Sequence, residues 1–245
     1  MGYVDSRHVA QIFSHVDPHQ VARYTAAAME RLLAGVEPFK RLTPVERGRL
    51  IAAAREKHLA KGETLFQAGQ PSDAVWVVKT GRIHLMKFLP DGKASTTCVM
   101  TPGEPFCCLP ALDQKAYPAD AIAAVESVVI RIPQHAFHDA MQRSALFMQG
   151  ALCLFCDRLR GVEEKSCMVY ESAEQRLAQV LLGLTKKFGA TVPLTRQELA
   201  EIAGLTLETT IRTLSRFKAQ QLIRSVRGTT TILDAPRLTR LAQPA

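Results

Sequence analysis

An apolar repeat between residues 145 and 169 constrains the fold more than any other feature of the sequence. Its members recur at alternating spacings of three and four residues: Ala145, Met148, Leu152, Phe155, Leu159, Val162, Ser166 and Val169. Seven of the eight are apolar, and an α-helix places such positions along one narrow stripe. A narrow stripe is typical of a two-stranded coiled coil, whereas a core helix usually has a broader apolar face. The repeat therefore predicts a dimerisation helix, with a long core helix as the alternative.

The sequence before this predicted helix indicates helices first and β-strands afterwards. Residues 1–60 have apolar side chains at helical spacing, and the run Thr43-Pro44-Val45-Glu46 predicts a capped helix start. Residues 62–133 instead contain short β-branched runs separated by Gly- and Pro-containing turns. The clearest predicted strands are 75–78, 82–86 and 127–130. Many short strands with this spacing predict an all-β roll or barrel, followed by a helix after Pro133.

The segment after the repeat predicts a helix-turn-helix. Thr195 followed by Glu198 is a capping-box pattern for the start of a first helix. Gly204 can adopt the left-handed conformation that the turn requires, and Thr206 can cap a second helix over residues 207–220. Residues 222–232 alternate around a glycine turn, as expected for a wing hairpin.

Positive charge is concentrated near the C-terminus. The 245-residue chain has 31 Lys+Arg and 23 Asp+Glu, a net charge of +8. Residues 212–240 contain seven of these cations and a single anion, Asp234. A local basic patch of this kind favours a polyanionic partner.

The amino-acid composition limits the class of protein and the cellular compartment that we expect. Apolar residues make up 47% and charged residues 22% of the chain, which is typical of one large or two modest globular domains. No apolar run approaches the roughly 18 residues of a membrane span, and the N-terminus lacks the apolar core of a signal peptide. We therefore expect a cytoplasmic protein without a membrane partner, and expect its six cysteines to be reduced thiols rather than disulfides.

The order of these elements, together with several short motifs, resembles the superfamily of the cyclic AMP receptor protein and the fumarate-and-nitrate-reduction regulator (CRP/FNR). The motifs in the roll are GETLF at 62–66, GRI at 81–83, DGK at 91–93 and PGEPF at 102–106; the C-terminal motif is TRQELAEIAGLTLETTIRTLSRF at 195–217. The resemblance covers nearly all of residues 35–240.

The resemblance implies an α+β architecture. Its parts are a cyclic-nucleotide-binding-like sensor β-roll (36–143), a dimerisation helix (144–171) and a C-terminal winged helix-turn-helix domain (172–245). Residues 1–35 lie outside the resemblance, and we expect them to form an N-terminal helical extension. The resemblance also implies three partners: a second copy in a homodimer, double-stranded DNA with a near-palindromic site, and RNA polymerase.

Within the matched helix, side chains of two kinds are candidates for contacting DNA. Glu208 can accept a hydrogen bond from cytosine N4, and Arg212 can donate two to guanine O6 and N7. The alternative for this i, i+4 pair is a surface ion pair. Ile211 departs from the serine that regulators of the nitrate-reduction type have at this place, which leaves the half-site open. Candidate contacts to phosphate, or for the threonines to a thymine methyl, are Arg196, Thr206, Thr209, Arg216, Lys218, Arg224 and Arg227.

The expected effector pocket departs from the cyclic-nucleotide pattern. Cys107-Cys108 stand where the family usually has Gly-Glu, and Tyr117-Pro118 stand where it has the Arg-Ser that holds the phosphate. Asp120 adds a negative charge nearby. We therefore disfavour a cyclic nucleotide as the effector.

Thiols at this place raise a second hypothesis. Cys107 and Cys108, with Cys153 and Cys156 of the dimerisation helix, could form a redox or cofactor site, and Cys107, Cys108 and Cys156 could ligate a metal. Haem or an iron–sulfur cluster would be the cofactor, with His84 as a further haem ligand. The alternative is that buried cysteines are simply small apolar residues.

These observations predict a homodimeric transcription regulator, not an enzyme, controlled by an effector other than a cyclic nucleotide. Redox state, a gas or a metal could act through the pocket cysteines. One alternative is a constitutive DNA-binding regulator without an effector. Another is a thiol oxidoreductase, although the Cys-x-x-Cys spacing of Cys153 and Cys156 lies on a helix and outside a βαβ unit.

Overall fold

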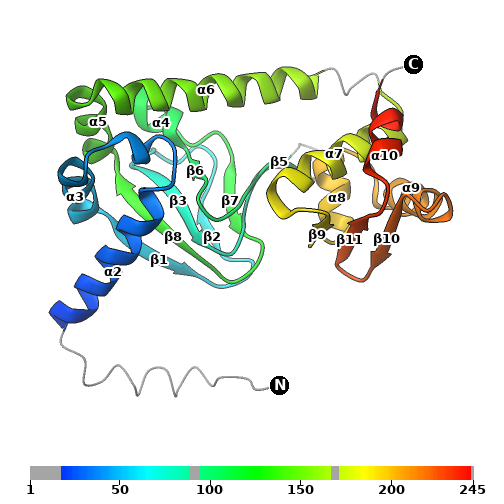
Figure 1. Ribbon diagram of the computed structural model, residues 1–245, viewed down its shortest axis with the longest axis horizontal. Coiled ribbons are helices and arrows are strands. Elements are labelled where there is room, and N and C mark those ends of the chain that lie inside the picture. Colours follow the sequence, from blue (N-terminus) through cyan, green and yellow to red (C-terminus); the bar gives the residue numbers. More distant parts are fainter. Residues whose placement is uncertain (1–17, 89–93, 167–170, 244–245) are drawn as a thin grey trace.

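The computed structural model describes residues 18–88, 94–166 and 171–243. It has a β-roll with helices at one side, a long helix that lies across the roll, and a smaller C-terminal domain beyond the far end of that helix (Figure 1). This arrangement confirms the predicted α+β class. None of the helices in these three ranges is long and apolar enough to cross a lipid bilayer.

The roll consists of two four-stranded antiparallel sheets. The first has the order β1-β8-β3-β6 and the second the order β2-β7-β4-β5. Their bounds are β1 Arg55–Leu59, β2 Thr64–Phe66, β3 Ala74–Thr80, β4 Ile83–Phe88, β5 Ala94–Met100, β6 Pro105–Phe106, β7 Asp120–Ala123 and β8 Ser127–Pro133. The β-branched runs predicted as strands form β3, β4 and β8.

The helical prediction is wrong for Arg55–Leu59, because this segment is strand β1. Only Leu59 of the strand is buried, so its sequence carries little of the alternation that identifies a strand. Its place comes from pairing with the apolar strand β8, in the register Arg55 opposite Arg131 through Leu59 opposite Ser127.

Helices cover one side of the first sheet. They are α2 Pro18–Leu33, the short 3-10 helix η2 Phe39–Arg41, α3 Pro44–Ala53, α4 Cys108–Asp113 and α5 Gln134–Arg143. Phe39, Phe137 and Phe147 are fully buried and meet edge-on or tilted in the core that these helices share. Helix α3 begins with a capping box of Thr43 and Glu46, so the predicted capped start is confirmed.

The predicted dimerisation helix is α6, Ala145–Ser166, and residues 167–170 at its predicted end lie outside the described residues. One face of α6, which includes Phe147 and Ala151, packs on the roll. The apolar repeat lies mainly on another face, where Leu152 and Leu159 are 54% and 60% exposed. The repeat is therefore not the core-facing stripe of this chain.

The C-terminal domain is a winged helix-turn-helix. It contains α7 Ala173–Phe188, β9 Thr191–Val192, α8 Arg196–Ala203, α9 Leu207–Ala219, β10 Ile223–Val226, β11 Thr229–Ile232 and α10 Ala235–Ala242. Strands β10 and β11 form the predicted wing, and β9 adds a third strand to it. The apolar faces of α7, α8, α9 and α10 share one core, in which Leu177, Leu199 and Phe217 are fully buried.

Candidate DNA-binding face and effector pockets

The two helices of the helix-turn-helix have the predicted caps. The Thr195 hydroxyl accepts a hydrogen bond from the Glu198 backbone N–H, and the Glu198 carboxylate accepts one from the Thr195 N–H at 2.6 Å. The Thr206 hydroxyl accepts the Thr209 N–H at the start of α9. Gly204 between the helices has φ +61°, the left-handed conformation expected of it. Residues close in sequence therefore form the turn between α8 and α9, and Arg176 of α7 adds a hydrogen bond to the Gly204 carbonyl at 2.8 Å.

Helix α9 presents a polar face to solvent. Its opposite face, with Thr210, Leu214 and Phe217, is buried in the domain core. Glu208 and Arg212 are both exposed, and in the described part of the chain they form no ion pair with each other. The alternative of a surface ion pair is therefore not supported, and both side chains are available to a ligand.

The remaining DNA candidates occupy different environments. Arg196 is exposed at the first residue of α8, and Lys218, Arg224 and Arg227 are exposed on α9 and the wing. Arg216 is also exposed, but its guanidinium lies 2.7 Å from the Glu174 carboxylate at the start of α7.

The two threonines are engaged within the chain. The Thr206 hydroxyl donates to the Thr209 hydroxyl at 2.9 Å while it caps the helix. Both side chains therefore have structural roles before any contact with phosphate.

Aromatic side chains fill the interior of the roll where a nucleotide phosphate would be expected. Tyr117 stacks on Phe66 with ring centroids 3.7 Å apart, and its hydroxyl accepts a hydrogen bond from the indole N–H of Trp76 at 3.1 Å. The Tyr117 hydroxyl in turn donates to Asp73. Asp120 is engaged by the Ala68 backbone N–H at 2.7 Å. The side chain of Tyr117 therefore occupies the position where the resemblance implies an arginine for the phosphate.

The adjacent cysteines Cys107 and Cys108 are buried in two different cores. Cys107 packs with the aromatic residues inside the roll, whereas Cys108 packs among the helices on its outside. Cys107 has φ +58°, which agrees with the glycine that the family usually has there. Burial raises the pKa of the Cys107 thiol to about 12 and that of Cys108 to about 11, so both are neutral at pH 7.

The structure does not bring the cysteines of the proposed cluster together as a metal site among the residues that it describes. Cys153 and Cys156 are exposed on α6, whereas Cys107 and Cys108 are buried. In the described ranges no three His, Cys, Asp or Glu side chains come together as a metal site would require. The set Cys107, Cys108 and Cys156 therefore does not form a ligand group, because consecutive residues at the start of α4 point into separate cores.

The expectation that His84 faces the effector pocket is wrong. Ile83 points into the roll, so the next side chain of β4 points outward, toward α8. His84 is buried there, with Nε2 3.6 Å from Glu198. Burial lowers its pKa to about 4, although the Glu198 carboxylate opposes this shift, so the imidazole is neutral at pH 7.

Polar contacts join the roll to the DNA-binding domain. Arg82 donates to the Pro193 carbonyl and to the Glu198 carboxylate, both at 2.8 Å. Burial opposes ionisation of Glu198, but hydrogen bonds from Thr195 and the charge of Arg82 hold its pKa below the usual value. The same carboxylate thus caps α8 and holds that helix against the roll. Sequence reasoning found only the cap, because nothing local links Arg82 to a residue 116 positions away.

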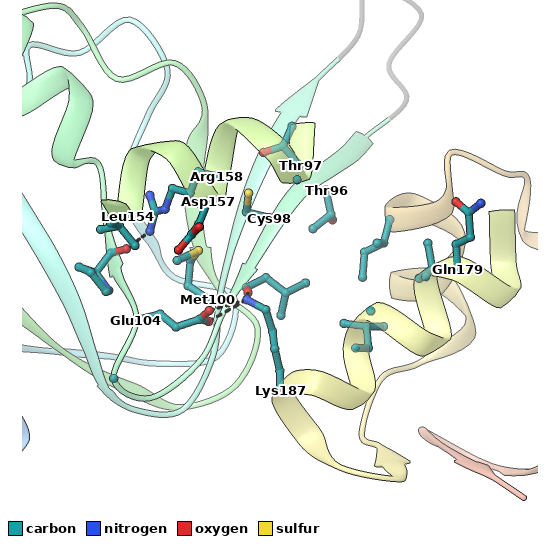
Figure 2. Close-up of a pocket in the computed structure, with 18 of the residues that line it drawn as sticks. Thr96, Thr97, Cys98, Met100, Glu104, Leu154, Asp157, Arg158, Gln179 and Lys187 are labelled. Atoms are coloured by element: carbon teal, nitrogen blue, oxygen red, sulfur yellow. Dashed lines mark hydrogen bonds and ion pairs between the residues drawn. The ribbon is translucent and has the colours of Figure 1, made fainter. Parts of the chain in front are cut away.

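A second ion pair crosses the boundary at Lys187 of α7. Its ammonium group donates to the Val99 carbonyl at 2.6 Å and to both carboxylate oxygens of Glu104. Figure 2 shows this pair at one wall of a cleft of about 560 Å³ between β5, α6 and α7. Most of the cleft lining is apolar, from residues such as Met100, Leu154 and Leu184.

Two sequence-family models match the chain in the two domains just described. The cyclic nucleotide-binding domain matches residues 56–144, and the Crp-like helix-turn-helix domain matches residues 175–241.

Several known proteins are similar to the chain over most of its length. The "Cyclic AMP receptor protein" of Thermus thermophilus is 25% identical over 206 residues, which cover 83% of this chain and 95% of that protein. The "Transcriptional activator protein FnrA" of Stutzerimonas stutzeri is 28% identical over 200 residues, covering 77% and 80%. The solved structure of FixK2 from Bradyrhizobium japonicum has a TM-score of 0.72 at 23% identity, covering 78% and 98%.

The exposed helix of a winged helix-turn-helix, joined to a roll that matches the cyclic nucleotide-binding domain, defines a DNA-binding transcription regulator. The chain belongs to the CRP/FNR family of transcription regulators.

Proposed function

We propose that the protein acts in the cytoplasm as a homodimer that binds a near-palindromic DNA site and regulates transcription through RNA polymerase, without catalysing a reaction. The observation that carries this proposal is the exposed face of α9, on which Glu208 and Arg212 stand free of each other. The carboxylate would accept from cytosine N4 while the guanidinium binds guanine O6 and N7 of a neighbouring base pair. We also propose that the chain consists of four parts, with boundaries after residues 35, 143 and 171.

The exposed apolar repeat of α6 supports the dimer. Met148, Leu152 and Leu159 are 43%, 54% and 60% exposed along one side of the helix. A second copy of α6 would cover these side chains in a coiled coil. The two α9 helices of the dimer would then enter successive major grooves about 34 Å apart.

Selection of binding sites from random duplexes tests this function. We expect an inverted repeat to be enriched, and Arg212→Ala to weaken binding to that repeat by about 1–3 kcal/mol while barely changing binding to random DNA. Equal losses on both kinds of DNA would contradict a base-reading role for Arg212. Arg224→Ala on the wing is the matched control, because it removes an exposed cation without removing a base contact.

We propose the interdomain cleft, rather than the interior of the roll, as the place where an effector acts. Tyr117 and Phe66 fill the roll interior, whereas the cleft is open and is lined by both domains. Its volume falls within the range typical of small-molecule pockets. The charge-bearing side chains of its lining all have partners within the chain: Lys187 pairs with Glu104, Glu37 with Lys40 and Arg41, and Asp157 with Arg160, while Arg158 donates to the Pro105 carbonyl. The cleft therefore favours a neutral and largely apolar molecule.

Gly183 of α7 provides a test, since it lines the cleft and nothing lies within 4 Å of a Cβ placed there. We expect the neutral fluorescent probe N-phenyl-1-naphthylamine to bind the wild type and to bind Gly183→Leu at least several-fold more weakly. Gly48→Leu, at an equally open position of α3 outside the cleft, is the control. Equal probe binding by all three proteins would contradict an effector site in the cleft.

The alternative, a constitutive DNA-binding regulator without an effector, predicts a different result. If operator affinity is the same with and without cyclic AMP, after oxidation of the thiols, and in Gly183→Leu, the protein is a regulator without an effector. Oxidation should have little effect, because the neutral, buried thiols of Cys107 and Cys108 are poor nucleophiles.

A further inference from the structure

Ile211 is an exposed apolar side chain within the polar face of the recognition helix α9. It is 36% exposed, while its neighbours on that face include Glu208 and Arg212. Three residues along an α-helix turn through 300°, so Ile211 lies only 60° around the helix from Glu208. Ser215, one further turn along, is within 40° of Ile211, and its hydroxyl donates to the Ile211 carbonyl at 2.9 Å.

Helix propensity does not favour an isoleucine at this position, and packing in this chain leaves 36% of it exposed. A β-branched side chain loses rotamer freedom in a helix, and an exposed one recovers little of that loss through packing. The core of the domain is on the other side of α9, where Thr210 and Leu214 are buried. The side chain of Ile211 therefore lies on the solvent-facing half of α9, 60° around the helix from Glu208 and 100° from Arg212.

Major-groove chemistry offers one apolar group to such a side chain. Guanine, adenine and cytosine present hydrogen-bond donors and acceptors there, whereas thymine also presents its C5-methyl group. A serine at this place could hydrogen-bond several bases, but an isoleucine can form no hydrogen bond. Burial of a polar base edge against Ile211 would leave that edge unsatisfied, and this disfavours the other bases.

We propose that Ile211 is a specificity-determining residue that selects thymine through its C5-methyl group, at a base pair next to the one bound by Arg212. This inference rests on the proposed DNA-binding function and names one element of its site. Because Ile211 adds apolar contact rather than charge, its effect is on the choice of sequence and not on general affinity for DNA.

Replacement of thymine by deoxyuridine removes only the methyl group and therefore tests the inference. Starting from the inverted repeat that the wild type selects, each thymine of both half-sites is replaced in symmetric pairs, and the dissociation constant is measured by fluorescence anisotropy. We expect one pair to weaken binding by roughly fourfold per half-site, the effect of burying one methyl-sized group. The same replacement should leave binding of Ile211→Ser unchanged.

Two further variants complete the design. Ile211→Val retains a branched apolar side chain and should keep most of the sensitivity to deoxyuridine. Leu233→Ser removes another exposed apolar residue (56%) beyond the wing and should behave as the wild type.

The outcomes separate this inference from the proposed function. If the wild type selects an inverted repeat but no thymine is sensitive, or if Ile211→Ser is as sensitive as the wild type, the role of Ile211 is wrong while the regulator remains. If no site is selected at all, the proposed DNA-binding function fails instead. Thermal unfolding of each variant should match the wild type, since Ile211 lies outside the buried core.

Discussion

Removal of one side chain from the exposed repeat of α6 should weaken the dimer by a calculable amount. Leu152 is 54% exposed in the single chain, and full burial of a leucine side chain stabilises by about 1.5–3 kcal/mol. Covering the exposed half in a coiled coil therefore contributes about 1 kcal/mol per chain. A symmetric dimer contains two copies, so Leu152→Ala should weaken it by about 2 kcal/mol, or roughly 30-fold in dissociation constant.

Analytical ultracentrifugation over a concentration series measures this change. Leu146→Ala is the matched control, because Leu146 is 61% exposed on the same helix but lies on the side away from the repeat. The control should leave the dissociation constant unchanged. If both variants weaken the dimer equally, or if neither does, the assignment of this stripe to a coiled coil is refuted.

Three other perturbations have defined outcomes. The folded-state pKa of His84 is about 4, below the ordinary 6.5, so only the unfolded chain takes up a proton between these values. The free energy of unfolding should therefore fall by about 1–3 kcal/mol as pH drops from 6.5 to 4. Chemical denaturation of His84→Gln should show a weaker dependence of this free energy on pH. Arg227→Ala on the wing should lower affinity for every sequence and reduce the slope of log K against log salt by about one, whereas an unchanged slope would argue against a phosphate contact. Gly204→Ala should lower the melting temperature, because a Cβ at φ +61° would also lie 2.5 Å from the Arg176 guanidinium; a melting temperature equal to the wild type would contradict this reading of the turn.

Features set by local sequence were predictable. The capping boxes at Thr43 and Thr195 and the left-handed Gly204 depend on residues within a few positions of one another, and all three are present. The strands β3 and β8 were predictable because both are rich in buried β-branched residues. Helix α10 was not predicted, although Asp234 followed by a proline at 236 is a start signal for it.

Features that depend on distant contacts were not predictable. The wrong direction assigned to His84 followed from not knowing which residue of β4 enters the roll, since a shift of one residue reverses every side chain of a strand. Cys107 and Cys108 are adjacent in sequence, yet the left-handed backbone at Cys107 sends them into separate cores. The joint role of Glu198, as cap and as partner of Arg82, exists only once the two domains meet.

Binding stoichiometry on the selected inverted repeat is the most direct test of the central claim. At physiological salt we expect two chains per duplex and an affinity at least 10³-fold higher than for random DNA. Scrambling one half-site should remove most of that preference. Binding of one chain per duplex, with the same affinity for the intact repeat, the half-scrambled repeat and random DNA, would contradict a dimeric regulator that reads sequence through α9.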